Sequence, residues 1–234
     1  TSGAQVIGQV QAYAGQYGIS TNPESFAVYG YRKYFADRNQ NVILRLSQDG
    51  ITEISEYGMT DYFRDNLSAV GNSGKVIGMW DMHNKQYVVS LQPGNTALPS
   101  ETLSFDEDSK GWTSFFDYIP NLGGSLINSF YTFKDGNLYK HNSNTTRNSY
   151  YGTLYPSKIT TIFNNEPAQT KQFKTIATNS TSPWDTIISS DQGAGYIDAD
   201  YYSLKEGTYY AYIRRNPDDN NLSMISAQGV GNVA

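Results

Sequence analysis

Apolar and polar residues alternate with a period of two along most of the chain. The clearest stretches are residues 42–47, 87–91 and 209–214. Successive side chains of a β-strand point to opposite faces of the sheet, so each stretch would place every second side chain on one face. The alternation therefore predicts β-strands at these positions.

One segment, residues 58–67, has helical spacing instead. Met59, Phe63 and Leu67 recur at intervals of four residues, which places them on one face of an α-helix. A helix this short is only marginally stable alone. We therefore expect one short helix that packs against a sheet.

Turn-forming residues separate the predicted strands. Asp135-Gly136 stands between the apolar stretches 131–133 and 138–141, and a two-residue Asp-Gly loop is typical of a tight β-hairpin. Phe133 would then face Leu138 across the hairpin. Because similar turn signals are frequent and the segments between them are short, the sequence predicts an all-β fold of antiparallel sheets.

Two parts of the chain have a similar order of residues. An Asp, a polar turn, a strand and a Gly follow one another from Asp37 to Gly50, and the same order recurs from Asp81 to Gly94, 44 residues further on. A β-propeller blade has a period of roughly 40–50 residues. This similarity predicts blade-like (β-propeller-type) units.

The character of the chain changes near Pro156. We predict a blade-like antiparallel β region over residues 1–156 and a terminal β-sheet or sandwich region with a flexible tail over residues 157–234. The strands expected in the second region are residues 159–163, 172–176 and 209–213.

Composition narrows the function classes. The chain has 234 residues, 20 of them tyrosine, a formal net charge of −5 and no cysteine. The lack of cysteine excludes a disulfide scaffold, a thiolate zinc site and a cysteine nucleophile. No apolar stretch is long enough to predict a transmembrane helix or membrane insertion. The first residues do not read as a signal peptide or include a start methionine, so we expect a piece of a longer protein.

No metal or cofactor site is predicted. The acidic turn Asp106–Gly111 begins like a calcium loop, but Lys110 stands where an oxygen ligand is required, and the bidentate Glu expected at loop position twelve is missing. The two histidines, His83 and His141, have no second donor at ligand spacing, so both are interpreted as surface residues.

Two carboxylates close in sequence are the remaining catalytic candidates. Asp198 and Asp200 would share one face of a strand, at a separation compatible with the ~5–9.5 Å that glycoside hydrolysis requires. Charged residues also protect the edges of sheets from aggregation. That second role is the preferred interpretation, so no catalytic residue is assigned.

The aromatic and basic residues offer further candidates. Trp80, Trp112 and Trp184 are possible stacking platforms for a saccharide, although Trp112 lies in an alternating stretch where sheet core is the commoner role. Nucleic-acid binding is not expected, because an acidic chain offers only small basic patches, at Lys171 with Lys174 and at Arg214-Arg215.

Several phrases of the sequence form a familiar set. The phrases are SFAVYGYRKYF (25–35) leading to RLSxxG (45–50), KGWTSF (110–115), NLYKHN (137–142), YYG (150–152), IFN (162–164) and KxFKT (171–175). Together they resemble large virion structural proteins of tailed bacteriophages, chiefly those of marine contractile-tailed cyanophages and, more distantly, crAss-like phages. The resemblance covers roughly residues 20–215.

The resemblance implies a non-enzymatic component of the phage tail or neck, often containing a β-propeller and often longer than this chain. Its partners would be other virion structural proteins, in homo- or hetero-oligomers, and it would reside in the virion. The resemblance supplies no catalytic, cofactor or metal residue. It implies that Trp112, Phe115 and Tyr139 lie inside the sheets and that Gly111 and Gly152 lie at strand ends.

Two alternatives from other function classes stay open. One is a receptor-binding tail module that stacks a host-surface saccharide on exposed tryptophan. The other is a glycan-degrading tail enzyme that uses the carboxylates near Asp198.

Overall fold

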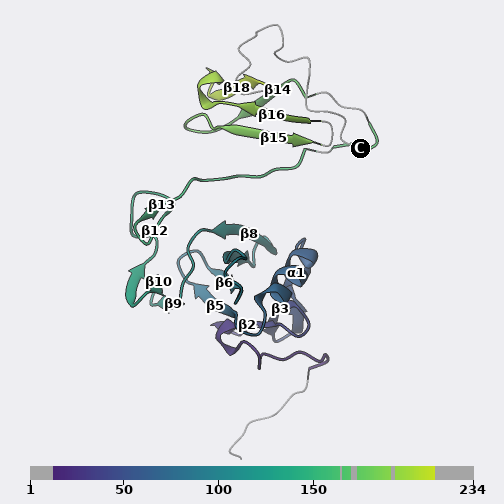
Figure 1. The fold of residues 1–234 in the computed structure, drawn as a ribbon, viewed down its shortest axis with the longest axis vertical. Coiled ribbons are helices and arrows are strands. Elements are labelled where there is room, and N and C mark those ends of the chain that lie inside the picture. Colours follow the sequence, from purple (N-terminus) through teal and green to yellow (C-terminus); the bar gives the residue numbers. More distant parts are fainter. Residues whose placement is uncertain (1–12, 164, 170–172, 191–192, 214–234) are drawn as a thin grey trace, which may run out of the picture. The chain divides into compact units, whose positions relative to one another are not determined.

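The computed structural model describes residues 13–163, 165–169, 173–190 and 193–213 (Figure 1). Contacts within the chain divide it into two compact units, Thr1–Ser157 and Lys158–Ala234. Almost all regular elements are β-strands, and the paired strands are antiparallel. The predicted all-β class is confirmed.

Two four-stranded sheets form the larger part of the first unit. In each, the strands lie in sequence order, β1-β2-β3-β4 and β5-β6-β7-β8. This is the strand number and order of a propeller blade. The described residues contain no closed ring of such sheets, so the propeller stays a prediction. The strands are β1 (Ala27–Tyr29), β2 (Arg32–Asp37), β3 (Val42–Ser47), β4 (Gly50–Glu53), β5 (Lys75–Asp81), β6 (Gln86–Gln92), β7 (Glu101–Asp106) and β8 (Gly111–Phe116).

The predicted helix is present as α1 (Thr60–Val70), next to β3 in Figure 1. It buries Phe63 and Leu67, as predicted, and continues one turn further because Val70 extends the same apolar face. Gly71 ends the helix with a positive φ of 65°. Two 3₁₀ helices, η1 (Pro23–Ser25) and η2 (Ile54–Glu56), precede it.

A column of four stacked rings joins the two sheets. Tyr29 stacks on Trp80 with ring centroids 4.2 Å apart, Trp80 lies 5.4 Å from Tyr34, and Tyr34 lies 4.9 Å from Tyr87. Tyr29 and Tyr34 belong to the first sheet, whereas Trp80 and Tyr87 belong to the second. Stacked aromatic pairs contribute beyond the area they bury, so this column helps to fix the packing of sheet on sheet.

A three-stranded sheet, in the order β11-β10-β9, packs on β5. The contact is close, because a Cβ atom at Gly123 would overlap the sulfur of Met79. The hairpin at Asp135-Gly136 is confirmed, with φ of 50° and 80°, and Phe133 faces Leu138 as predicted. The strands are β9 (Leu122–Leu126), β10 (Ser129–Lys134) and β11 (Asn137–Lys140), followed by the hairpin β12 (Ser149–Tyr150) and β13 (Thr153–Leu154).

The second unit contains two small sheets, β14-β18-β17 and β15-β16. Its core comprises Ile197, Tyr202, Ala211 and Ile213. The predicted strand at residues 209–213 is confirmed as β18, apart from its last residue. The elements are β14 (Thr175–Thr178), β15 (Thr186–Ser190), β16 (Gly193–Ile197), η3 (Ala199–Tyr201), β17 (Ser203–Lys205) and β18 (Thr208–Tyr212).

The strands predicted at residues 159–163 and 172–176 have different outcomes. The predicted strand at 159–163 is wrong: the segment has no strand, and Ile159, Ile162 and Phe163 are exposed. A strand requires a neighbour to bond its backbone groups, and an apolar stretch alone does not supply one. The predicted strand at 172–176 corresponds to β14, which begins at Thr175; residue 172 and the tail from 214 lie outside the described residues.

The same four-residue loop closes three hairpins of the first unit. Each loop follows an aspartate that ends a strand, namely Asp37, Asp81 or Asp106. The Oδ1 atom of each aspartate accepts a hydrogen bond from the backbone N–H two residues on, at 2.8–2.9 Å. The last loop residue has a positive φ, of 56° at Asn41, 57° at Lys85 and 50° at Lys110.

This shared loop changes two interpretations. Asp37 ends the second strand of its sheet, whereas Asp81 ends the first strand of the other sheet, so the repeat of 44 residues is a repeat of the loop and not of a whole blade. The calcium-like turn at Asp106 is also an example of this loop, in which Lys110 occupies the left-handed position.

Candidate functional site

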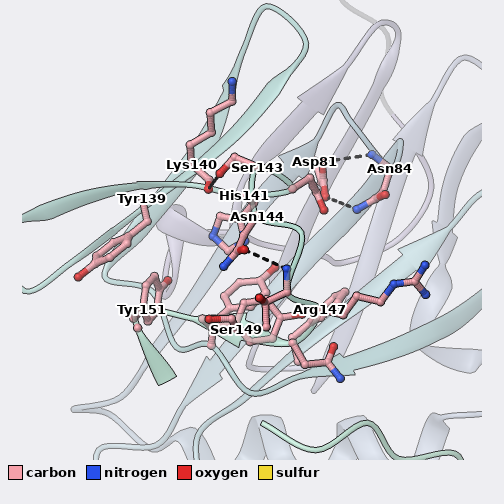
Figure 2. Close-up of a pocket in the computed structure, with 17 residues that line it drawn as sticks. Asp81, Asn84, Tyr139, Lys140, His141, Ser143, Asn144, Arg147, Ser149 and Tyr151 are labelled. Carbon is pink, nitrogen blue, oxygen red and sulfur yellow. Dashed lines mark hydrogen bonds between the residues drawn. The ribbon is translucent and has the colours of Figure 1, made fainter. Parts of the chain in front are cut away.

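A hollow of about 470 Å³ opens in the first unit (Figure 2). It is lined by residues from the β5–β6 loop, the end of β8 and the segment from β11 to the turn after β12. Its aromatic lining residues are Phe116, Tyr118, Tyr139, His141, Tyr150 and Tyr151. Most of its other lining residues are polar or charged. Ligand sites combine such concave aromatic surfaces with polar groups that orient the ligand.

Tyr118 is the centre of the floor. It is 3% exposed, and its ring centroid lies 4.6 Å from that of His141, 5.1 Å from Tyr150 and 5.2 Å from Phe116. Its hydroxyl makes no hydrogen bond to another described side chain. Burial, together with the charge of Asp81, raises the pKa of Tyr118 well above its ordinary value. The floor therefore presents a neutral phenol that lacks a hydrogen-bond partner within the described residues.

A hydrogen-bond chain lies behind the floor. The buried Thr132 hydroxyl is 2.7 Å from His141 Nε2 and 2.8 Å from the Tyr151 hydroxyl. Burial lowers the pKa of His141, and the opposing effect of Asp81 is smaller. A neutral imidazole fits a chain in which Tyr151 donates to Thr132 and Thr132 donates to Nε2, which leaves Nδ1 with the ring proton.

Polar side chains form the rim of the hollow. Asp81 is 4% exposed, and its carboxylate accepts from the backbone N–H groups of His83 and Asn84 and from Asn84 Nδ2 at 2.8 Å. Lys140 and Arg147 are exposed. Because Asp81 is already engaged by its own loop, the accessible charge of the rim is positive.

Local backbone conformation positions the floor. Tyr151 and Gly152 form the turn between β12 and β13 with φ of 52° and 84°. Gly adopts this conformation without a steric penalty, but in a tyrosine it costs about 1–2 kcal/mol. The ring of Tyr151 contacts Tyr139 at 4.6 Å and Thr132 through its hydroxyl. These contacts stabilise the unusual turn residue.

The hollow offers aromatic faces, hydroxyls and amides. Its one carboxylate, Asp81, already accepts hydrogen bonds from its own loop. These groups can bind a ligand by ring stacking and by hydrogen bonds.

The three tryptophans considered as saccharide platforms have different surroundings. Trp80 is buried in the ring column, so it is not available for stacking on a ligand. Trp112 is half-buried, donates from Nε1 to the Ile54 carbonyl at 2.9 Å and packs on Phe63. Trp184 is half-buried in the second unit. None of the three lines the hollow.

Phe115 and Tyr139 differ from the expected core positions. Phe115 is mostly exposed, because it lies on the edge strand β8 where Tyr62 touches it edge-on at 5.6 Å. Tyr139 is half-buried at the hollow. Gly111 begins β8, as expected, whereas Gly152 is the second residue of a turn.

Asp198 and Asp200 do not share a strand face. Asp198 precedes the 3₁₀ helix η3, and its Oδ1 atom accepts a hydrogen bond from the backbone N–H of Asp200 at 2.9 Å. The predicted strand pair is therefore wrong, and Asp198 is a helix cap. Of the basic patches, Lys174 is exposed, and Lys171, Arg214 and Arg215 lie outside the described residues.

The histidines have different surroundings. His83 is exposed on the β5–β6 loop, as predicted, but His141 is half-buried in the hollow, so its assignment to the surface is wrong. The sequence contained one signal for this site: the polar run 142–149 between His141 and Tyr150-Tyr151. This run alone did not predict a site, because the site also depends on Tyr118 and Thr132, which only the fold brings close to His141.

Among the described residues, no group of three or more histidine and carboxylate side chains is arranged to hold a metal ion. No helix there has the length and apolar character needed to cross a membrane.

Residues 145–216 match the family model described as the Crassvirus muzzle protein C-terminal domain. No curated protein matches the chain. The matched segment, less than a third of the chain, is thus similar to a domain of a crassvirus protein. It includes Tyr150 and Tyr151 of the hollow and most of the second unit, whereas Tyr118, Thr132 and His141 precede it.

Proposed function

We propose that this chain is a structural component of the tail or neck of a tailed-bacteriophage virion and acts by protein–protein assembly. The observation that carries the proposal is the match of residues 145–216 to the Crassvirus muzzle protein C-terminal domain. A structural family of this kind suggests a non-enzymatic role. We further propose that the chain belongs to a longer polypeptide, with a blade-like region over 1–156 and a terminal β region over 157–234.

An exposed apolar row supports an assembly role. Leu122, Phe133 and Leu138 lie opposite one another on β9, β10 and β11, and they are 52%, 45% and 58% exposed. The neighbouring residue Thr132 points to the other face of the sheet and is buried. Clustered exposed apolar side chains often mark protein–protein interfaces, so we assign this row to subunit contact.

Exposed aromatic and aliphatic side chains also occur outside this row. Tyr210 and Tyr212 project from one face of β18, and Ile187 is exposed on β15. Tyrosine supplies contact area at a low cost in side-chain entropy. Many such contacts act together in a symmetric particle, so each one can be weak.

The residues predicted for the enzymatic alternative do not form a catalytic pair. Its predicted pair, Asp198 and Asp200, forms a helix cap instead of a cleft. The resemblance to contractile-tailed cyanophages stays a prediction, since the family match is to the crassvirus group.

Quantitative mass spectrometry of purified particles tests the proposal. Peptides from this chain should occur in a fixed ratio to the other tail or neck proteins across independent preparations. Detection in the infected-cell lysate but not in purified particles would contradict a structural role.

A further inference from the structure

We propose that the hollow floored by Tyr118, Tyr150 and Tyr151 is a carbohydrate-binding site that prefers a saccharide carrying a carboxylate. The inference goes beyond the assembly role, because a virion component needs no such site. It depends on the geometry of Figure 2 and not on the family match.

The composition of the lining selects the ligand class. Among the residues that line the hollow there is no Ala, Val, Leu, Ile or Met. An apolar peptide anchor or a lipid chain would find aromatic edges and amides there, without the aliphatic surface that binds such groups. A sugar ring has both an apolar C–H face, which matches a tyrosine ring, and a polar edge.

The hydrogen-bonding groups match sugar hydroxyls. Sugar hydroxyls both donate and accept, and so do the amide and hydroxyl side chains of the rim. These side chains include Asn84, Asn142, Asn144, Asn148, Ser143 and Ser149. A bound peptide strand would instead need backbone partners along a sheet edge.

Tyr118 supplies an anchor at the bottom of the hollow. Its ring is almost fully buried, yet its hydroxyl has no hydrogen-bond partner among the described side chains, and the residue lines the cavity. The hydroxyl therefore has free hydrogen-bonding capacity at the surface of the cavity. A ligand hydroxyl at this position would pair with it.

The charge of the rim selects an acidic sugar. Arg147 and Lys140 are exposed and form no ion pair with another described residue, whereas Asp81 is buried and already accepts hydrogen bonds from its own loop. A carboxylate on the ligand would complete a charge-assisted hydrogen bond with Arg147. The whole chain has a net charge of −5, so this positive rim is local.

A glycan array probed with the fluorescently labelled full chain tests the proposal. The array carries neutral hexose, N-acetylhexosamine and hexuronate oligomers, and the chain should bind at least one carboxylate-bearing glycan. Retention of neutral glycans alone, or of no glycan above the signal of a Tyr150→Leu variant, would overturn the proposal. Binding of a peptide from a neighbouring virion protein without any glycan binding would also overturn it.

Calorimetric titration with the best acidic glycan then locates the site. Arg147→Gln should weaken that glycan roughly tenfold, the loss expected for one charge-assisted hydrogen bond. Arg64→Gln on α1 removes the same charge from an exposed position outside the hollow and should leave affinity unchanged. Equal affinities of the Arg147→Gln and unaltered chains would overturn the role of the hollow.

Circular dichroism separates loss of binding from loss of fold. Arg147 is exposed, so the Arg147→Gln variant should have the same melting temperature as the unaltered chain. Particle mass spectrometry is independent of glycan binding, and failure here would leave the assembly proposal standing.

Discussion

Tyr34 donates a hydrogen bond to Glu107 across the two four-stranded sheets, with Oη and Oε1 2.6 Å apart. The other carboxylate oxygen of Glu107 accepts from Arg45 Nη1 at 2.8 Å. The side chains of Glu107 and Arg45 are 9% and 17% exposed. One carboxylate on the β7–β8 loop thus bonds to both β2 and β3 of the first sheet.

Glu107→Ala should destabilise the first unit strongly. The substitution leaves the Arg45 guanidinium without its nearest carboxylate and the Tyr34 hydroxyl without its acceptor. Loss of one member of a largely buried pair costs about 2–4 kcal/mol. Urea unfolding followed by circular dichroism measures the change.

An exposed ion pair on α1 provides the control for this prediction. Asp65 pairs with Arg64 at the surface, so Asp65→Ala should leave the unfolding midpoint almost unchanged. Equal midpoints for the two variants would show that Glu107 does not hold the sheets together.

Gly123→Ala should also destabilise the first unit. A Cβ atom there would overlap Met79 Sδ and lie 2.9 Å from the Tyr131 carbonyl oxygen. This oxygen belongs to the backbone of β10, so it cannot easily move away. Overpacking of this kind costs about 1–3 kcal/mol. Thermal melting measures the loss.

The neighbouring glycine is a matched control. A Cβ atom at Gly124 meets no atom within 4 Å, so Gly124→Ala should be tolerated. Equal melting temperatures of the two alanine variants would contradict the close packing of β9 on β5.

The stability of the first unit should decrease below about pH 6.5. Burial lowers the pKa of His141 below 6.5, so in this pH range the unfolded chain binds a proton that the folded chain does not. The free energy of unfolding therefore falls as the pH drops from 6.5 towards the lowered pKa and is insensitive to this group above 6.5. Urea titrations at a series of pH values measure the slope.

The second histidine separates this effect from general acid sensitivity. His141→Gln should flatten the pH dependence of stability over this range, whereas His83→Gln at the exposed loop should preserve it. A slope that persists unchanged in His141→Gln would contradict the assignment.

Polar substitution of the exposed apolar row should weaken assembly without unfolding the chain. Leu122→Ser combined with Leu138→Ser removes exposed apolar surface on both sides of Phe133. Incorporation of the chain into particles in a complementation assay should fall, while its melting temperature stays close to that of the unaltered chain. Leu204→Ser, at a similarly exposed position on β17, is the control and should be incorporated normally.

The elements that local pattern determines were predictable. The period of four at Met59, Phe63 and Leu67 located α1, and Asp135-Gly136 located a hairpin with its register. The end of α1 at Val70 was not predicted, because one further apolar residue and Gly71 set the boundary of the helix.

The parts that depend on distant contacts were not predictable. Residues 159–163 have a strand-like pattern but no neighbouring strand, so the alternation alone was misleading. Asp198 caps the 3₁₀ helix η3 and Asp200 lies within it, because the Asp198 carboxylate bonds to the local backbone in competition with a strand.

The hollow was missed for the same reason. It combines Tyr118 after β8, Tyr139 from β11 and Tyr150 from β12, which are separated by 11–32 residues in sequence. Each residue alone reads as an ordinary sheet residue. Only the packing of the β9–β11 sheet on β5 brings them together.

The most direct test of the central claim is quantitative mass spectrometry of gradient-purified particles. The proposed role predicts that this chain copurifies with infectious virions and keeps a constant ratio to the tail and neck proteins through successive gradients. Progressive loss of the chain from particles whose other tail and neck proteins are retained would contradict it.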